Sequence, residues 1–253
     1  MKSRSDGQYL IAGASSDIGR ELIRQLEKNP LNRIMAISRS MCQPFKTGLD
    51  TNHEYLSGLD LTQESDLGII RSHAKKFFDQ PFTTIHSVGD FWNHKPLVDT
   101  PLLEARKMIE SHYFTLYGLA QAILPVQKEL GGGRLIAFSC NSVGYNYPDM
   151  AAFTSAKAAL ECLIKCIANE YSQYGIVANA IALSTILTPK VEKAKKKKYF
   201  KDYLTVEELV EIILDNIAGL SSFVNGNVIK LLKYSEYFYN EGYYQRNPTN
   251  AAY

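Results

Sequence analysis

Short apolar runs alternate with longer amphipathic stretches along most of the chain. Gln8–Ala12 has the mostly apolar character of a buried strand, and Ile18, Leu22 and Leu26 then recur at helical spacing until Asn29-Pro30 ends the helix. Helical stretches of 12 to 24 residues separate most of the remaining apolar runs. Those runs predict further strands at Arg33–Ser38, Thr83–Val88, Arg134–Ser139, Ile176–Leu183 and Asn227–Leu232.

Strands that alternate with helices pair in parallel through right-handed crossovers. The sequence therefore predicts an α/β fold in which residues 1–253 form a single domain, a Rossmann-type doubly wound parallel sheet of about seven strands with helices on both faces. Gly131–Gly133 is expected to turn from a helix into a strand, and residues 189–204 to form a loop. Ligands are expected at the carboxyl ends of the strands.

Composition narrows the class of protein. The chain has 253 residues, of which 45% are hydrophobic, and its 28 Lys and Arg against 26 Asp and Glu favour no nucleic-acid partner. The N-terminus leads directly into the first strand, and no stretch of about 18 apolar residues follows. We therefore expect a soluble, cytoplasmic protein with no membrane contact. No CxxC pair occurs, so we expect reduced thiols at Cys42, Cys140, Cys162 and Cys166.

The turn after the first strand has the composition of a phosphate-binding loop. Gly13-Ala14-Ser15-Ser16-Asp17-Ile18-Gly19 leads into a helix, whose N-terminal amides and positive dipole end favour a pyrophosphate. Asp17 occupies the place of the middle glycine in the usual Gly-x-x-x-Gly-x-Gly. An ordinary turn is the alternative interpretation of this run.

Four segments in order make the pattern more specific. The Gly13–Gly19 turn, Asp60-Leu61-Thr62, residues 155–160 (SAKAAL) and residues 179–182 (NAIA) have the order and spacing found in short-chain dehydrogenases/reductases. The chain resembles this family over residues 8–233. The resemblance implies a nicotinamide cofactor, a substrate cleft at the sheet edge and assembly into a homodimer or homotetramer.

The segment after the second strand indicates which nicotinamide cofactor to expect. Nineteen residues beyond Gly19, where NAD-preferring folds place an acid, the chain has Ser38 followed by Arg39. A cation there favours a 2′-phosphate and hence NADP(H), with a solvated surface charge as the alternative. The resemblance assigns cofactor contacts to Gly13, Ser15, Ser16, Asp17, Ile18, Gly19, Ser38, Arg39, Asp60, Leu61, Ser87, Gly89, Lys157 and Thr188.

The catalytic positions of the family are altered. A Tyr-x-x-x-Lys pair would place a tyrosine where this chain has Phe153, four residues before Lys157. Cys140 lies thirteen residues before Phe153, where the family has a serine, and His112 lies where it has an asparagine. Phenylalanine neither donates a proton nor binds an oxyanion, so a general acid worth about 10²–10⁴ in rate is missing.

Neighbouring residues offer partial replacements. His112 is either a general acid or base or a side chain that fills the asparagine's space, and Cys140 is either an activated thiolate or a small buried residue. In the segment Asp90-Phe91-Trp92-Asn93-His94-Lys95, Phe91 and Trp92 line a substrate or partner pocket, or the segment is a plain loop. No metal is expected, because His86, His94 and His112 lack ligand spacing. Other candidate donors are Tyr145, Tyr147, Ser139, Ser142 and Tyr113, with Tyr145 and Tyr147 as loop aromatics that cover the cleft as the alternative.

Two segments bear on substrate and partners. Lys193 and Lys195–Lys198, within the expected substrate loop 189–204, suit an anionic or carrier-bound substrate such as a phosphopantetheine or coenzyme A thioester, or are simply solvated. The capping box Thr205-Val206-Glu207-Glu208 predicts a helix start after this loop. The tyrosine-rich extension, residues 234–253, suggests an oligomer interface.

Three classes of function remain open at this stage. The first is an NADP(H)-dependent oxidoreductase with a non-standard site, acting on a small or carrier-bound carbonyl or hydroxyl compound. The second is an inactive homologue that serves as a binding protein or as the heteromeric partner of an active reductase. The third is a non-redox isomerase or lyase using the same cleft.

Overall fold

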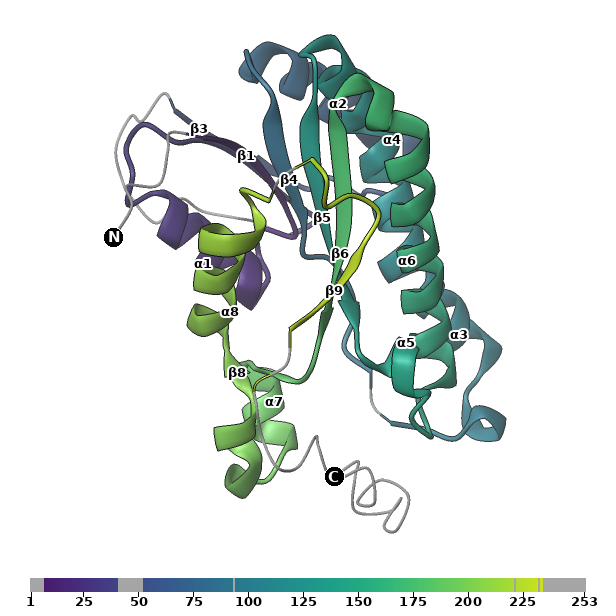
Figure 1. Cartoon of the computed structure of the whole chain (residues 1–253). Coiled ribbons are helices and arrows are strands. Elements are labelled where there is room, and N and C mark those ends of the chain that lie inside the picture. The colour runs from purple at the N-terminus through teal and green to yellow at the C-terminus, as the bar shows by residue number, and fades with distance from the viewer. Residues whose placement is uncertain (1–6, 41–51, 93, 221, 232, 234–253) are drawn as a thin grey trace.

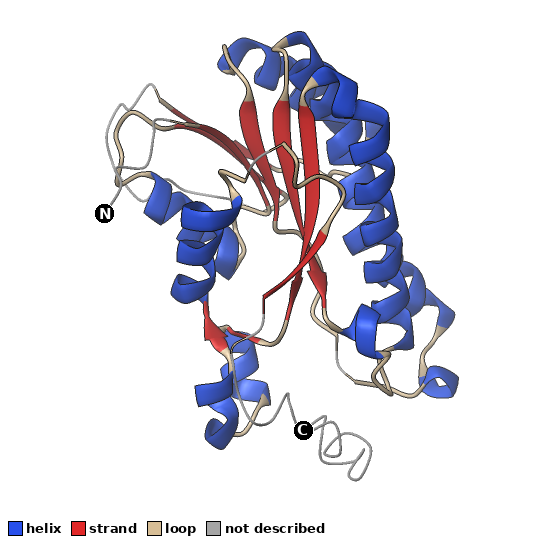
Figure 2. Cartoon of the chain, in the orientation of Figure 1, coloured by secondary structure: helices blue, strands red, loops and turns tan. Residues whose placement is uncertain are grey.

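Seven parallel strands form the central sheet in the order β3-β2-β1-β4-β5-β6-β9. Figure 2 shows these strands in red, with helices on either side in blue. The computed structural model describes residues 7–40, 52–92, 94–220, 222–231 and 233. The chain order reverses between β1 and β4, which creates a crevice at the carboxyl ends of these two strands. The strands are β1 (Gln8–Ala12), β2 (Arg33–Ser38), β3 (His53–Ser57), β4 (Phe82–His86), β5 (Gly133–Cys140), β6 (Ile176–Leu183) and β9 (Val228–Leu231).

Helices cover both faces of the sheet (Figure 1). One layer contains α2 (Glu64–Phe77), α4 (Thr115–Glu129) and α6 (Ala151–Tyr171), and the other contains α1 (Asp17–Leu26) and α8 (Val206–Ile212). The remaining elements are η1 (Leu97–Asp99), α3 (Leu102–Ile109), η2 (Glu110–Phe114), α5 (Ser142–Tyr145), η3 (Ser172–Tyr174), β7 (Ile186–Leu187), α7 (Pro189–Ala194), η4 (Lys197–Asp202), β8 (Leu204–Thr205) and η5 (Ile213–Ile217).

Alternate residues of each strand belong to different cores. Leu10 packs beneath the α2–α4–α6 layer, whereas Ile11, the next residue of β1, packs beneath α1 and α8, and both are fully buried. Burial on both faces explains why the central strands are continuous apolar runs rather than alternating ones. The predicted doubly wound sheet with helices on both faces is confirmed.

The strand predictions were wrong in detail at two places. β4 begins at Phe82 and ends at His86, so the predicted Thr83–Val88 extends two residues into the loop that follows. Sequence patterning also missed β3, an edge strand of sequence HEYLS whose residues are half-buried or exposed. An edge strand buries too little to need an apolar pattern.

The region predicted as a loop between residues 189 and 204 is largely helical. Thr188 accepts a hydrogen bond from the Val191 amide, and Pro189 occupies the first helical position, a combination that starts α7. After η4, the capping box that begins α8 is confirmed: the Thr205 amide donates to Glu208 at 2.9 Å, and the Glu208 amide donates to Thr205 at 3.1 Å.

Several further predictions can be placed in the structure. Gly131 and Gly132 have positive φ and lead from α4 into β5, as expected. Cys140, Cys162 and Cys166 are free thiols, while Cys42 and the tyrosine-rich residues 234–253 lie outside the described residues. Within the described ranges, no helix combines the length and apolar character that crossing a membrane requires.

Candidate active site

The Gly13–Gly19 turn joins β1 to α1 at the edge of the crevice. Gly13 has φ +87°, and a Cβ there would lie 2.7 Å from the Ser87 carbonyl oxygen. A Cβ at Gly19 would lie 2.2 Å from the Gly13 carbonyl oxygen, so only glycine allows the helix to start this close to the strand. Ser16 caps α1 by accepting from the Gly19 amide at 3.0 Å. The N-terminus of a helix is thereby directed into the crevice.

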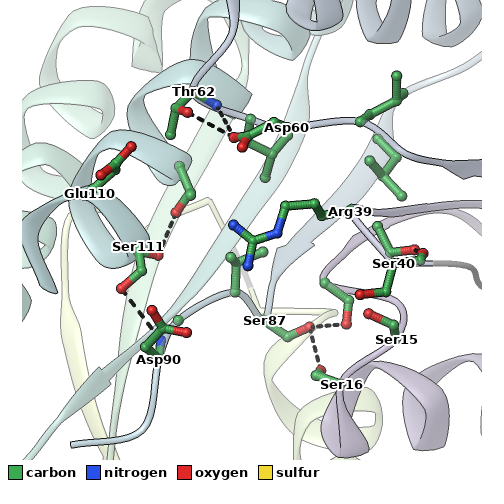
Figure 3. Close-up of a pocket in the computed structure, with 18 of the residues that line it drawn as sticks. Ser15, Ser16, Arg39, Ser40, Asp60, Thr62, Ser87, Asp90, Glu110 and Ser111 are labelled. Carbon is green, nitrogen blue, oxygen red and sulfur yellow. Dashed lines mark hydrogen bonds between the residues drawn. The ribbon is translucent and has the colours of Figure 1, made fainter. Parts of the chain in front are cut away.

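A pocket of about 520 Å³, here pocket A, lies between the Gly13 turn and the carboxyl ends of β2 and β4. Figure 3 shows the Arg39 side chain reaching into pocket A between the Asp60–Thr62 turn and Ser87. The Asp60 carboxylate accepts hydrogen bonds from the Thr62 amide and hydroxyl, at 2.9 and 2.8 Å. Pocket A therefore places a cation and the Gly13 turn around the same space.

A second cavity, pocket B, continues from pocket A toward the carboxyl ends of β5 and β6. Its volume is about 750 Å³. Pockets A and B form one elongated cleft, because six residues line both: Ser15, Ser16, Ser87, Val88, Gly89 and Asp90. Ligand pockets typically have volumes of about 300–1,000 Å³, and both pockets lie within that range.

Most of the predicted cofactor residues line this cleft, and one does not. Asp17, Ile18, Lys157 and Thr188 line pocket B, whereas Gly19 lines neither pocket and acts through close packing instead. Ser38 is buried, and its hydroxyl donates to the Ser40 carbonyl oxygen. The others line pocket A: Gly13, Ser15, Ser16, Ser38, Arg39, Asp60, Leu61, Ser87 and Gly89.

The four residues predicted to occupy the family's catalytic positions meet in pocket B. Its lining includes Lys157 and Phe153 from α6, His112 from η2, and Cys140 from the end of β5. Lys157 Nζ donates to the Phe138 carbonyl oxygen at 2.7 Å and lies 5.7 Å from the centre of the Phe153 ring. The Phe153 ring meets the His112 ring edge-on, with centroids 5.2 Å apart. Their chemical roles stay predictions.

Burial makes both histidines beside Lys157 electrically neutral. Desolvation, with the Lys157 charge as a further cause, lowers the pKa of His112 to about 2 and that of His86 to about 3. His86 Nε2 lies 3.0 Å from the Thr115 hydroxyl, and both ring nitrogens of His112 are without a hydrogen-bond partner among the described residues. His112 therefore does not serve as a proton-donating imidazolium near neutral pH.

His112 occupies space that only a glycine opposite it leaves open. A Cβ at Gly89, which has φ +155°, would lie 2.2 Å from the His112 ring. This fit supports the interpretation of His112 as a side chain that fills the asparagine's space, and argues against its role as a general acid. The π-helical turn η2 aims the ring inward at this point.

Of the five other candidate proton donors, only two line pocket B. Tyr147 and Ser139 line pocket B, but the Ser139 hydroxyl donates to the Glu161 carboxylate at 2.6 Å. Tyr145 is 51% exposed and stacks on Tyr147, outside the cavity lining. Ser142 and Tyr113 do not line pocket B either.

Sequence analysis missed Asn141, which the structure places in the cavity wall. Asn141 is 4% exposed, lines pocket B, and has no hydrogen-bond partner for its side-chain oxygen or nitrogen among the described residues. An unsatisfied buried amide is costly, so a ligand that hydrogen-bonds with it would bind favourably. Its position directly after β5 was the available signal, because carboxyl ends of strands carry site residues.

The loop after β4 and the basic segment form the mouth of pocket B. Phe91 and Trp92 line it, and Trp92 Nε1 donates to the Asp149 carbonyl oxygen at 2.7 Å, which fixes the indole against the wall. Lys193 and Lys195 line the cavity as predicted, whereas Lys196–Lys198 do not. Burial lowers the pKa of Lys195. Sequence analysis overlooked a third lining lysine, Lys190, which lies 5.9 Å from the centre of the Phe91 ring.

Within the described ranges, no three His, Cys, Asp or Glu side chains lie close enough together to hold a metal ion.

The sequence of this chain is similar to those of known proteins. The family model described as enoyl-(acyl carrier protein) reductase matches residues 13–228. YtkK of Bacillus subtilis (strain 168) is 27% identical over 183 residues, covering 68% of this chain and 72% of YtkK. The 7alpha-hydroxysteroid dehydrogenase of Escherichia coli (strain K12) is 24% identical over 142 residues, covering 53% of this chain and 55% of that enzyme.

Solved structures share the fold at lower sequence identity. ElxO with NADP bound superposes with a TM-score of 0.76 at 21% identity, covering 89% of this chain and 96% of ElxO. A tyrosine-to-phenylalanine variant of ElxO with NADPH bound gives the same TM-score, identity and coverage.

Proposed function

This chain belongs to the short-chain dehydrogenase/reductase family of oxidoreductases, and from that premise we propose that it binds NADP(H) and acts on a carbonyl or hydroxyl compound at a non-standard site. The observation that carries the proposal is the continuous cleft of pockets A and B, with Arg39 in pocket A and Lys157 in pocket B. Both the helix N-terminus and the buried lysine face the same space.

The choice of NADP(H) over NAD(H) depends on pocket A. Arg39 reaches into it from the end of β2, and a guanidinium binds a phosphate through charge-assisted hydrogen bonds. ElxO, whose fold this chain shares, has been solved with NADP, and its tyrosine-to-phenylalanine variant with NADPH. Loss of a tyrosine hydroxyl is therefore compatible with nucleotide binding in that protein, which supports the same for a chain with Phe153.

The residues of pocket B suit an oxygen-bearing substrate. Bound NADPH would supply a hydride to a carbonyl carbon. The Asn141 amide is placed to donate a hydrogen bond to the carbonyl oxygen, with the Cys140 thiol as a second donor beside it. Lys157 would hold the cofactor ribose, and Phe153 and Trp92 would keep water away from the reacting atoms.

The cavity mouth favours a substrate that carries negative charge. Lys190, Lys193 and Lys195 all line pocket B, and Lys190 lies 5.9 Å from the centre of the Phe91 ring. We propose a carbonyl or hydroxyl compound with an anionic group, either a small acid or a carrier-bound thioester, whose charge meets these lysines while its reacting end reaches Asn141.

Titration of the purified protein with NADPH and NADH, followed by nicotinamide fluorescence, tests the proposed function. We expect micromolar NADPH binding and weaker NADH binding. Arg39→Ala should weaken NADPH binding by about 10- to 100-fold, because a charge-assisted hydrogen bond contributes about 1.5–3 kcal/mol, and should leave NADH binding unchanged. Arg71→Ala is the matched control, since Arg71 donates to the Gln121 carbonyl oxygen and lines neither pocket. Binding of neither nucleotide would refute the proposal.

Asp17 is expected to weaken nucleotide binding in the native chain. Its carboxylate is exposed at the first turn of α1, where a pyrophosphate would approach. Two like charges about 6 Å apart cost about 1–2 kcal/mol at a partly solvated site. Asp17→Gly should therefore tighten NADPH binding by about tenfold.

The comparison of Asp17→Asn with Asp17→Gly separates charge from size. If repulsion dominates, both variants bind NADPH more tightly than the native chain. If the side chain obstructs the nucleotide, only Asp17→Gly does. Equal affinity of all three proteins would show that the pyrophosphate does not lie at this turn.

A second candidate function is a non-catalytic member of the family that partners an active reductase. Phe153 and Cys140, which replace two hydroxyl-bearing residues, favour it. Oxidation of NADPH by the purified native chain with any carbonyl compound would exclude this candidate.

A further inference from the structure

Lys157 is a buried cation without a carboxylate partner. Its side chain is 6% exposed, and Nζ donates to the Phe138 carbonyl oxygen at 2.7 Å. The carboxylate one helical turn away, Glu161, accepts from Ser139 at 2.6 Å instead, and within the described part of the chain no Asp or Glu oxygen forms an ion pair with Nζ. A buried ammonium is stable when an opposite charge compensates it, and here a neutral carbonyl group does so only in part.

The surroundings of Nζ favour the neutral amine. From its own helix come Phe153 and Glu161, from η2 and β4 the neutral rings of His112 and His86, and from β5 the thiol of Cys140. Burial lowers the pKa of Lys157 to about 8, although Cys140 and Glu161 act in the opposite direction. About a tenth of the molecules then carry an unprotonated amine near pH 7, against fewer than about one in a thousand for an exposed lysine.

This amine opens onto a cavity suited to an apolar molecule. Pocket B, at about 750 Å³, has room for a ligand of moderate size, and aromatic and aliphatic side chains including Phe153, Trp92 and Met150 form its wall. Phe153 supplies no hydroxyl to hydrogen-bond with Nζ or to compete with it for a carbonyl carbon. A desolvated lysine in an apolar pocket is the arrangement that activates this side chain as a nucleophile.

We propose that Lys157 forms an imine with apolar aldehydes that enter pocket B. The nitrogen lone pair adds to the carbonyl carbon, and one proton moves from nitrogen to oxygen to give a carbinolamine. The carbon–oxygen bond then breaks, and the hydroxyl leaves as water with the second proton of the nitrogen as the carbon–nitrogen double bond forms. The step consumes one aldehyde, releases one water, and needs no oxidant or reductant. The proposal shares Lys157 with the proposed function but does not require a bound nucleotide.

Reductive trapping tests the imine directly. The full chain is incubated with benzaldehyde and sodium cyanoborohydride near pH 7.5, and the modified lysines are located and quantified by peptide mass spectrometry. We expect Lys157 to be labelled about tenfold faster than Lys165, an exposed lysine on the same helix, because the larger fraction of neutral amine outweighs its lower basicity. Labelling of Lys157 no faster than that of Lys165 would overturn the proposal.

Two variants and a competition experiment complete the test. Lys157→Arg keeps a cation and should remove the fast label, whereas Lys165→Arg should leave it unchanged. NADPH should slow the labelling of Lys157 by benzaldehyde if NADPH and benzaldehyde occupy the same end of the cleft. Fast labelling without nucleotide binding would refute the proposed function and leave the imine proposal standing. Nucleotide binding without fast labelling would refute the imine proposal and leave the proposed function standing.

Discussion

Phe153→Tyr is expected to raise NADPH-dependent carbonyl reduction by about 10²- to 10⁴-fold, the usual contribution of a positioned general acid. The Phe153 ring lines pocket B with its centre 5.7 Å from Lys157 Nζ, so a hydroxyl on this ring enters the cavity beside an ammonium group. That charge favours ionisation of the phenol and hence proton donation to a substrate oxygen. The measurement is the rate of NADPH oxidation with a panel of aldehydes and ketones.

Phe114→Tyr provides the matched control for this gain of activity. Phe114 is 50% exposed and does not line pocket B, so a hydroxyl there should change the rate by less than about twofold. A Phe153→Tyr variant that still binds NADPH but reduces no member of the panel faster than the native chain would contradict the prediction. It would mean that the proton reaches the substrate by a route that bypasses position 153.

The second large effect concerns stability in acid. Burial lowers the pKa of His86 to about 3 and of His112 to about 2, whereas an unfolded histidine titrates near pH 6.5. Below about pH 6.5 the unfolded chain therefore binds protons that the folded chain does not. The free energy of unfolding should fall by about 4 kcal/mol between pH 7 and pH 5, about 2 kcal/mol for each residue. Urea denaturation at the two pH values measures it.

His112→Asn separates this contribution from other titrations. The substitution removes one buried imidazole, so the loss of stability between pH 7 and pH 5 should be about half that of the native chain. His94, whose pKa burial also lowers, adds in the same direction, and the lowered pKa values of Glu21 and Glu208 matter only in more acidic solution. Equal losses for the variant and the native chain would show that His112 is protonated in the folded state.

The fit between Gly89 and His112 links stability to the altered site. A ring in this place requires glycine opposite it, and it positions an uncharged surface against Phe153 and near Lys157. The aromatic and imidazole rings together form an apolar environment for the lysine. Phe153 and His112 thus belong to a packed group of rings close to Lys157.

Most of the fold could be predicted from the pattern of apolar residues, because strands that are buried on both faces of a parallel sheet are continuous apolar runs. Five of the seven sheet strands were predicted within a residue or so of their bounds, as Arg33–Ser38 illustrates. Residue patterning did not predict the edge strand β3, since an edge buries little and its sequence need not be apolar. It also did not predict the helices within residues 189–202, because Thr188 and Pro189 start a helix that is too short to show a periodic pattern.

By itself, the sequence determined the sheet and the Gly13–Gly19 turn between the first strand and the first helix, since both depend on residue type at a fixed spacing. Only the tertiary structure decided which side chains share one cavity. Asn141 and Lys190 line pocket B although no motif contains them. The Ser139 hydroxyl donates its hydrogen bond to Glu161, which lies on another element. Burial, and with it the neutral state of His112, likewise follows from packing between distant segments, because desolvation depends on every neighbour in space.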